Sequence, residues 1–300
     1  MAILADETTT ILIQGITGRE AASMSQEMLN YGAKVVAGVT PGKGGQAVHG
    51  IPVYDTVAQA CDQHHPTATI VSVPARLAKD AVMEASAHGI TLAVVLTERI
   101  PKQDVIEAVT YASVRGMRII GPNSPGIISP GKTRLGYLGG SNPERAFKPG
   151  PVGVVSRSGG MTTEVANLLF RFGFGVSTAI GMGGDPVVGS TYLDYFPLFE
   201  ADPETKVIVL YVEPGGTKEE ALAQKLGHEF KKPVIVFLGG KFVDTMPGTR
   251  FGHASVMVRP GSGSGSAAEK IRRFREAGAT VVDRYSELAG AVEKALQVSG

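Results

Sequence analysis

The feature that most constrains this chain is a regular alternation of short apolar runs with longer helix-forming stretches. The runs are rich in Val and Ile and nearly continuous in apolar residues, which is typical of strands buried on both faces of a parallel sheet. The alternation therefore predicts an α/β fold. The predicted strands are 10–16, 34–40, 69–74, 92–97, 118–122, 152–156, 176–180, 207–213, 233–238 and 280–283. The predicted helices are 19–31, 56–63, 76–88, 102–115, 161–173, 188–200, 217–230, 265–277 and 285–297.

A polar stretch containing Pro and Gly interrupts the alternation at 139–150. Such a stretch is typical of a linker, and the same strand–helix rhythm restarts after it. A length of 300 residues also exceeds one typical domain. The sequence therefore predicts two doubly wound α/β domains, 1–145 and 146–300.

Charge and cysteine content exclude several classes of protein. The 29 basic and 28 acidic residues give a net charge of +1, which argues against a strongly basic nucleic-acid binder. A single cysteine, Cys61, excludes an internal disulfide framework and a cysteine-based zinc site, and no His falls at metal-ligand spacing, so we expect no metal ligands. The apolar runs are too short to cross a bilayer, and the N-terminus lacks a basic region. We expect a cytoplasmic protein, or one of the mitochondrial matrix in a eukaryote.

Two glycine-bearing loops of the first half suit a phosphate group. Gly15–Arg19 closes the first strand and opens a helix, whose N-terminus offers free N–H groups. Lys43 stands among three glycines after the second strand. A dinucleotide fingerprint would need a third Gly and an acidic residue closing the second strand, and both are missing. We interpret the loops as a cradle for a phosphorylated adenosine moiety, although the first loop fits a plain tight turn equally well.

Three features of the second half could carry chemistry. Ser158–Gly160 begins a helix, and two consecutive glycines after a good N-cap favour an anion cradle. His253 lies in a Gly-rich loop between small neighbours, and Glu213 ends a predicted buried strand. A carboxylate there could orient an imidazole and raise its basicity. The rigid loop that holds Asn123 and Ser124 fits a structural turn when taken alone.

As an ordered set, these loops resemble the α subunit of succinyl-CoA synthetase and its superfamily, which includes malate–CoA ligase, citryl-CoA synthetase and part of ATP-citrate lyase. The resemblance covers essentially the whole chain. The matching strings are GITG (15–18), GVTPGKGG (38–45), GPNSPGII (121–128), VSRSGG (155–160), GGDPVVGS (183–190), EPGG (213–216) and GHAS (252–255).

The resemblance implies a Rossmann-like CoA-binding domain followed by a flavodoxin-like ligase domain. It implies that His253 is phosphorylated, that Glu213 orients it, and that the cofactor is coenzyme A. It also implies a partner β subunit with an ATP-grasp fold, in a heterodimer or heterotetramer of the tricarboxylic acid cycle, which binds ATP or GTP with Mg. The implied CoA contacts are Thr17, Gly18, Arg19, Lys43, Val73, Pro74, Thr97 and Glu98. The implied phosphate or substrate contacts are Asn123, Ser124, Ser158, Gly159 and Gly160.

The expected activity is formation of succinyl-CoA from succinate, CoA and a nucleoside triphosphate, through a phosphohistidine and an acyl phosphate. The sequence departs from the family pattern at Glu20, Pro214, Gly160 and Ser255, so a malate- or citrate-specific ligase is an alternative. A non-catalytic CoA-binding module would keep the Gly loops but have no use for His253 with Glu213. A nicotinamide oxidoreductase is disfavoured by the incomplete fingerprint.

Overall fold

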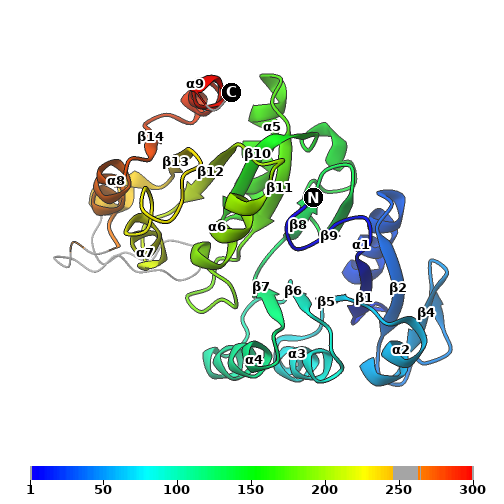
Figure 1. Cartoon of the computed structure of the whole chain (residues 1–300). Helices are drawn as coiled ribbons and strands as arrows, with labels where there is room; N and C mark the ends of the chain where they lie inside the picture. The colour runs from blue at the N-terminus through cyan, green and yellow to red at the C-terminus, as the bar shows by residue number, and fades with distance from the viewer. Residues whose placement is uncertain (1, 246–262, 264, 299–300) are drawn as a thin grey trace. The chain divides into compact units, whose positions relative to one another are not determined.

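In the computed structural model, residues 2–245, 263 and 265–298 are described, and the chain forms two compact units. The N-terminal unit comprises Leu4–Pro143 together with Val187–Ser190. The C-terminal unit comprises Glu144–Pro186 and the described residues from Thr191 onward, with residues 2 and 3. Each unit contains parallel strands accompanied by helices, so the predicted α/β class is confirmed (Figure 1).

The sheet of the N-terminal unit has the strand order β3-β4-β2-β1-β5-β6-β7. All neighbours are parallel except the short β3, which is antiparallel to β4. The strands are β1 (Thr10–Gln14), β2 (Lys34–Val39), β3 (Ala47–Val48), β4 (Ile51–Tyr54), β5 (Ala68–Val71), β6 (Leu92–Val95) and β7 (Arg118–Ile120). The helices are α1 (Arg19–Asn30), α2 (Val57–His64), α3 (Ala78–Ala87) and α4 (Lys102–Val114), with a 3-10 turn at Ala75–Leu77.

The order of the parallel strands, β4-β2-β1-β5-β6-β7, is that of a Rossmann fold. The central strand β1 is completely buried at Ile11, Leu12 and Ile13, as its continuous apolar run predicts. The chain order reverses between β1 and β5, and such folds bind ligands in the crevice outside the strand ends at this point. The loops after β1 and β5 are therefore the expected ligand loops of this unit.

The parallel strands of the C-terminal unit have the order β14-β13-β12-β10-β11. The strands are β10 (Pro149–Ser156), β11 (Val176–Gly181), β12 (Val207–Val212), β13 (Val234–Leu238) and β14 (Thr280–Val282). The helices are α5 (Gly159–Arg171), α6 (Tyr192–Ala201), α7 (Lys218–Ala223), α8 (Ala267–Glu276) and α9 (Leu288–Val298), with 3-10 turns at Lys241–Thr245 and Tyr285–Glu287. This is the flavodoxin-like order, and its reversal point lies between β10 and β12.

Several elements differ from the sequence-based expectation. The antiparallel pair of β3 and β4, and the hairpin of β8 (Gly126–Ser129) and β9 (Thr133–Gly136) in the N-terminal unit, were not predicted. These short strands lie among Gly and Pro residues, which indicate turns in the sequence. Helix α6 begins at Tyr192 rather than 188, because Thr191 and Asp194 form a capping box that fixes its start. Helix α7 ends at Ala223 rather than 230. Gly227 follows with a left-handed φ of 75°, a conformation that does not continue a helix.

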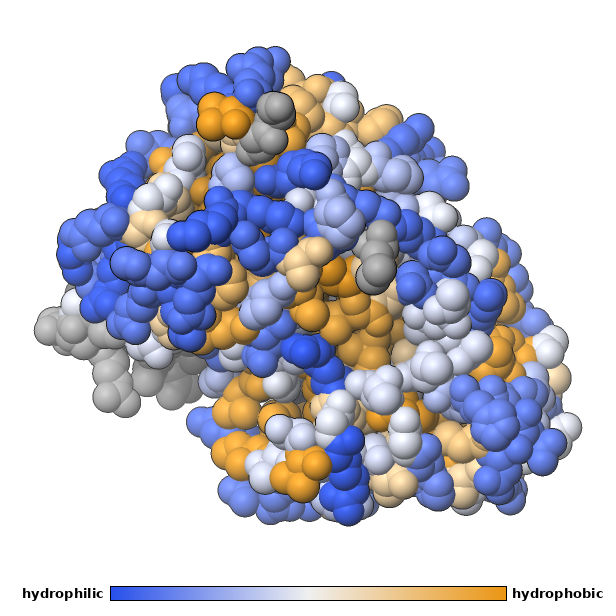
Figure 2. Space-filling view, in the orientation of Figure 1, coloured by the Kyte–Doolittle hydropathy of each residue, from blue (hydrophilic) through white to orange (hydrophobic). Residues whose placement is uncertain are grey.

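Hydrophilic side chains predominate on the face drawn in Figure 2, and apolar side chains gather in patches between them. Apolar atoms are visible over α3 and α4, in keeping with Leu77 and Ile106, which are 45% and 42% exposed. Scattered apolar residues of this kind are normal for a protein surface. Within the described residues, every helix is too short or too polar to span a bilayer.

Candidate functional site

Glycine at position 15 lets the loops after β1 and β5 approach each other closely. Gly15 has a φ of 84°, and a Cβ atom there would lie 2.2 Å from the backbone oxygen of Ser72. No other residue fits, because a side chain would meet both the strained φ and the neighbouring backbone. The close approach brings Gly15, whose loop continues to Thr17 and Gly18, beside the loop of Ser72 and Val73.

Hydrogen bonds join the four loops that carry the predicted CoA contacts in two pairs. Thr17 Oγ1 lies 3.2 Å from Thr40 Oγ1, which links the loops after β1 and β2. Thr97 Oγ1 donates to the Val73 carbonyl at 2.8 Å, which links the loops after β5 and β6. Asn123 N donates to the Thr97 carbonyl at 3.0 Å, so the loop of Asn123 and Ser124 joins the same edge. The structure therefore brings these residues to one edge of the sheet.

The first helix leaves its N-terminus open and carries exposed cations nearby. Gly18 is the N-cap of α1 and forms no side-chain capping hydrogen bond. Arg19 and Lys43 are both exposed, as are Gly18 and Glu98. Free N–H groups at a helix start, together with basic side chains, suit a phosphate group. Glu20 is also exposed, in the first turn of α1, and its negative charge would oppose the binding of a phosphate group there.

In the C-terminal unit, the predicted anion cradle lies after β10. Ser158 is the N-cap of the 13-residue helix α5, and its hydroxyl accepts a hydrogen bond from Met161 N at 3.4 Å. Gly160 is exposed at the helix start, and a Cβ atom there would meet nothing within 4 Å. The cap that the sequence predicted at Ser158 is therefore present. The positive end of the helix dipole lies at the same end of the helix.

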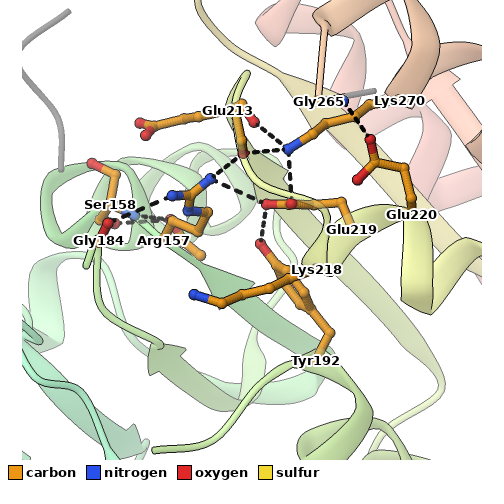
Figure 3. A network of polar contacts seen from close by, with 12 residues as sticks. Arg157, Ser158, Gly184, Tyr192, Glu213, Lys218, Glu219, Glu220, Gly265 and Lys270 are labelled. Carbon is orange, nitrogen blue, oxygen red and sulfur yellow. Dashed lines mark hydrogen bonds and ion pairs between the residues drawn. The ribbon is translucent and has the colours of Figure 1, made fainter. Parts of the chain in front are cut away.

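Beside this helix start lies a buried network of charged side chains, which we call the ionic cluster and define as Arg157, Glu219 and Lys270 (Figure 3). Lys270 Nζ donates to Glu219 Oε2 at 2.8 Å and to the carbonyls of Glu213 and Gly215 at 2.9 and 2.8 Å. Arg157 Nη1 donates to the same Gly215 carbonyl at 3.0 Å. The ionic cluster thus holds the loop that follows β12 from two sides.

The remaining contacts of the ionic cluster come from neighbouring elements. Tyr192 of α6 donates its hydroxyl to Glu219 Oε1 at 3.3 Å, and burial raises the pKa of Tyr192 well above its usual value. Burial opposes the charge of Arg157, but the attractions of Glu219, Tyr192 and Glu213 together raise the pKa of Arg157. Burial, with repulsion from Arg157, lowers the pKa of Lys218 to about 8. Lys218 Nζ donates to the Asp185 carbonyl at 3.2 Å.

Glu213 directly follows β12, at the reversal point of the sheet. Its carbonyl faces Lys270, whereas its carboxylate extends away from Lys270, toward the side on which Ser158 is drawn (Figure 3). Glu213 and the helix start of α5 therefore share one edge of the parallel sheet. His253, with which Glu213 is predicted to act, lies outside the described residues.

Sequence reasoning missed the ionic cluster. A signal was present in helix α8, where Ala267, Lys270 and Phe274 are all buried and repeat at helical spacing. A lysine within such an apolar stripe indicates a buried charge, which needs a partner. Its partner Glu219 comes from a helix far away in the sequence, so the pairing itself could not be read from local pattern.

Comparisons with known proteins agree with this architecture. Residues 6–99 match the model of a CoA binding domain, and residues 155–279 match that of a CoA-ligase. The first match contains all eight predicted CoA contacts.

Relatives match over their full length. The chain is 45% identical to the succinate–CoA ligase [ADP-forming] subunit alpha 2 of Archaeoglobus fulgidus, over 99% of this chain and 100% of the relative. It is 41% identical to the corresponding alpha subunit of Aquifex aeolicus, over 99% of this chain and 96% of the relative.

A solved structure of ATP citrate lyase from Methanothrix soehngenii, in complex with citrate and coenzyme A, matches with a TM-score of 0.89 at 25% identity. The match covers 99% of this chain and 51% of that chain, so this protein spans about half the length of the lyase chain. The full-length similarity to these relatives and the two matching domain models lead to one assignment. The chain belongs to the family of succinate–CoA ligase α subunits, which are subunits of acid–CoA ligases.

Proposed function

We propose that this chain, together with an ATP-grasp β subunit, forms succinyl-CoA from succinate, CoA and a nucleoside triphosphate. The observation that carries the proposal is the placement of Glu213 and the N-terminus of α5 at the reversal point of the ligase sheet. A carboxylate and the positive end of a helix dipole are what a phosphorylated imidazole requires. The partner holds the nucleotide, ATP or GTP, with its Mg.

The reaction divides into three transfers. His253 attacks the γ-phosphoryl group, and the nucleoside diphosphate leaves. A succinate oxygen then takes the phosphoryl group from His253, which gives succinyl phosphate and free imidazole. The CoA thiolate finally attacks the acyl carbon, the thioester forms, and inorganic phosphate leaves. Splitting the reaction makes each step easier, because phosphate is a far better leaving group than oxide.

The residues of this chain have distinct tasks in these steps. Glu213 accepts a hydrogen bond from the imidazole of His253 and raises its basicity. The helix start at Ser158, Gly159 and Gly160 stabilises the phosphoryl oxygens, since phosphoryl transfer depends on positioning and charge stabilisation. The loops of the N-terminal unit hold CoA through Thr17, Gly18, Arg19, Lys43, Val73, Pro74, Thr97 and Glu98. Asn123 and Ser124 border these loops and contact phosphate or substrate.

The proposal is tested with the α subunit coexpressed with its β partner. Nucleotide labelled in the γ-phosphate should label the wild-type chain through an acid-labile, base-stable bond, and succinate with CoA should discharge the label. His253→Ala should lose labelling and succinyl-CoA formation, and Glu213→Gln should slow labelling. Turnover by His253→Ala at a comparable rate would overturn the phosphohistidine mechanism. Turnover by the rigorously purified single chain would overturn the need for the partner.

A citrate-type acid is the second candidate substrate, favoured by the structural likeness to ATP citrate lyase. The discharge assay decides between the two acids, because succinate, malate and citrate can each be offered to the same labelled enzyme. Discharge by succinate alone supports the first proposal, and discharge by citrate or malate alone replaces it. If the chain binds CoA but nucleotide does not label it, and no acid yields an acyl-CoA, the result would instead support a non-catalytic CoA-binding module.

A further inference from the structure

Asp55 holds the loop that carries Lys43. This loop follows β2, and Asp55 follows β4, the parallel neighbour of β2, so both lie at the same edge of the sheet. Gly44 N donates a hydrogen bond to Asp55 Oδ1 at 2.9 Å. Gly44 directly follows Lys43 in the chain. A side chain from outside the loop therefore fixes the main chain beside the cation that the proposed function assigns to CoA.

The two ends of the loop are attached to β4 through the main chain. The N–H groups of Thr40 and Gly45 each donate to a carbonyl of β4 at 3.0 Å. The N–H of Lys43 donates back to the Thr40 carbonyl at 3.0 Å, within the loop itself. The hydrogen bond that Asp55 accepts lies between the two ends and connects the middle of the loop to the rest of the unit.

Gly44 provides the space in which the Asp55 carboxylate lies. A Cβ atom at position 44 would lie 2.5 Å from Asp55 Oδ2 and 2.9 Å from Asp55 Cγ. The other glycines of the loop, Gly42 and Gly45, have left-handed φ values of 75° and 84°, and a Cβ atom on either would meet nothing within 4 Å. The φ of Gly44 lies outside the left-handed region. The contact with Asp55 therefore requires the small size of Gly44 and not an unusual backbone conformation.

The start of α2 fixes the main chain of Asp55. Thr56 is the N-cap of α2, and its hydroxyl accepts a hydrogen bond from Gln59 N at 3.2 Å. The Gln59 side chain reaches back and accepts a hydrogen bond from Asp55 N at 3.1 Å. Such a reciprocal pair stabilises the start of a helix and the residues before it. The carboxylate of Asp55 is therefore presented to the loop from an ordered main chain.

The charge of Asp55 has the wrong sign for a direct contact with a phosphate group. A carboxylate near Lys43 repels the anion that Lys43 is expected to attract. By its charge Asp55 opposes CoA binding, and it favours binding only by holding the loop. The two effects have opposite signs, so the sign of the change in affinity distinguishes them.

We infer that Asp55 is a positioning residue, whose carboxylate holds the main chain of Gly44 so that Lys43 is presented to a phosphate group of CoA. The inference rests on the proposed function, which assigns Lys43 to CoA. A loop that is ordered before binding loses less conformational freedom when the ligand arrives, so the ligand binds more tightly. In this role Asp55 contacts neither CoA nor the reacting atoms.

The first test replaces Asp55 in the α subunit with its partner present. Asp55→Ala should weaken CoA binding about fivefold in calorimetry, the order expected for one net hydrogen bond, although it removes a negative charge. Asp55→Asn keeps an oxygen that accepts from Gly44 N, and it should bind CoA at least as tightly as wild type. The matched control is Asp62→Ala. Asp62 lines the same surface hollow as Gly44 and Asp55, so its loss removes the same charge and should not weaken binding.

Steady-state kinetics separates this role from a general loss of structure. Asp55→Ala should raise the KM for CoA about fivefold and leave kcat and the KM for succinate at their wild-type values, because the loop acts on CoA binding alone. A general structural defect would lower kcat and the thermal midpoint as well.

The second test uses double variants. Lys43→Ala alone should weaken CoA binding, and adding Asp55→Ala should weaken it less than twofold further, because the cation that Asp55 positions is already gone. Gly44→Ala alone should act like Asp55→Ala, since the new Cβ atom displaces the carboxylate, and it should add little to Asp55→Ala. Independent defects would instead multiply their effects.

The outcomes separate this inference from the proposed function. Unchanged or tighter CoA binding by Asp55→Ala would overturn the positioning role while the contact of Lys43 with CoA stands. Equal weakening by Asp55→Asn or Asp62→Ala, or multiplied effects in either double variant, would overturn it in the same way. Wild-type affinity in Lys43→Ala would overturn both the positioning role and the assignment of Lys43. Absence of CoA binding by the wild-type enzyme would mean that the proposed function itself has failed.

Discussion

Lys270 Nζ lies 2.8 Å from Glu219 Oε2, and the two side chains are 0% and 1% exposed. Arg157 Nη1 approaches the other oxygen of Glu219 at 3.5 Å, and its side chain is 4% exposed. Removing charges from water costs several kcal/mol per ion, and only close pairing with satisfied hydrogen bonds offsets that cost. The ionic cluster is therefore stable as a set, and loss of one member leaves the others buried without compensation.

Glu219→Gln should consequently destabilise the protein by about 3–5 kcal/mol, because it leaves two buried cations without their counter-charge. The matched control is Glu229→Gln, which breaks an ion pair of similar length, 2.9 Å to Lys225, whose side chains are 53% and 43% exposed. That change should cost about 0.5 kcal/mol or less. Urea denaturation measures both changes, and equal losses would show that burial does not decide the energetics of the ionic cluster.

Lys218 should make stability depend on pH in the alkaline range. Burial first, and then the nearby Arg157, lower its pKa from 10.5 to about 8, against the attraction of Glu219 and Asp185. Between these two values the unfolded chain binds the proton and the folded chain does not. The contribution of Lys218 to stability therefore falls as pH decreases from about 10.5 to about 8, and stays at its lowest value below that.

Lys218→Met tests this sign. The variant should be more stable than wild type near pH 7, and the difference should shrink as pH rises toward 10.5. Lys218→Arg is the control, because guanidinium keeps its charge over the whole range and should show no convergence with Lys218→Met. Thermal midpoints between pH 7 and 10 measure the three proteins. A constant difference between Lys218→Met and wild type would contradict the lowered pKa.

The sequence predicted the strands and the loops better than it predicted the contacts between them. Continuous apolar runs identified β1, β10 and β12, because a strand buried on both faces has apolar residues throughout and not apolar residues alternating with polar ones. Glycines at strand ends predicted loops at these positions, and Ser158 was read correctly as an N-cap. Local pattern could not reveal Lys270 with Glu219, which join two separate helices. Local pattern equally could not reveal that the Tyr211 ring lies against Gly239, because the two residues come from neighbouring strands that meet only in the folded sheet.

Gly15→Ala should remove CoA binding and lower stability together. The new Cβ atom would lie 2.2 Å from the Ser72 carbonyl oxygen, and the residue would keep a φ of 84°. Gly32→Ala is the control, since its φ is 90° but nothing lies within 4 Å of the new atom. It should cost about 1 kcal/mol from the left-handed backbone alone and leave CoA affinity unchanged. Calorimetry with CoA and thermal unfolding distinguish the two, and equal behaviour would contradict the close approach of the loops.

Lys43 and Glu20 should change CoA affinity in opposite directions. Both are exposed, Lys43 in the loop after β2 and Glu20 in the first turn of α1. Lys43→Ala should weaken binding by about 1–3 kcal/mol through loss of a phosphate contact. Glu20→Gln should strengthen binding, because it removes a negative charge beside the helix start, and the gain should shrink at high salt. Lys34→Ala is the control. Lys34 is exposed at the start of β2, at the end of the strand away from the loop of Lys43, so its loss should leave CoA affinity unchanged. Calorimetry at two salt concentrations measures all three, and weaker binding by Glu20→Gln would place the CoA phosphates away from this helix start.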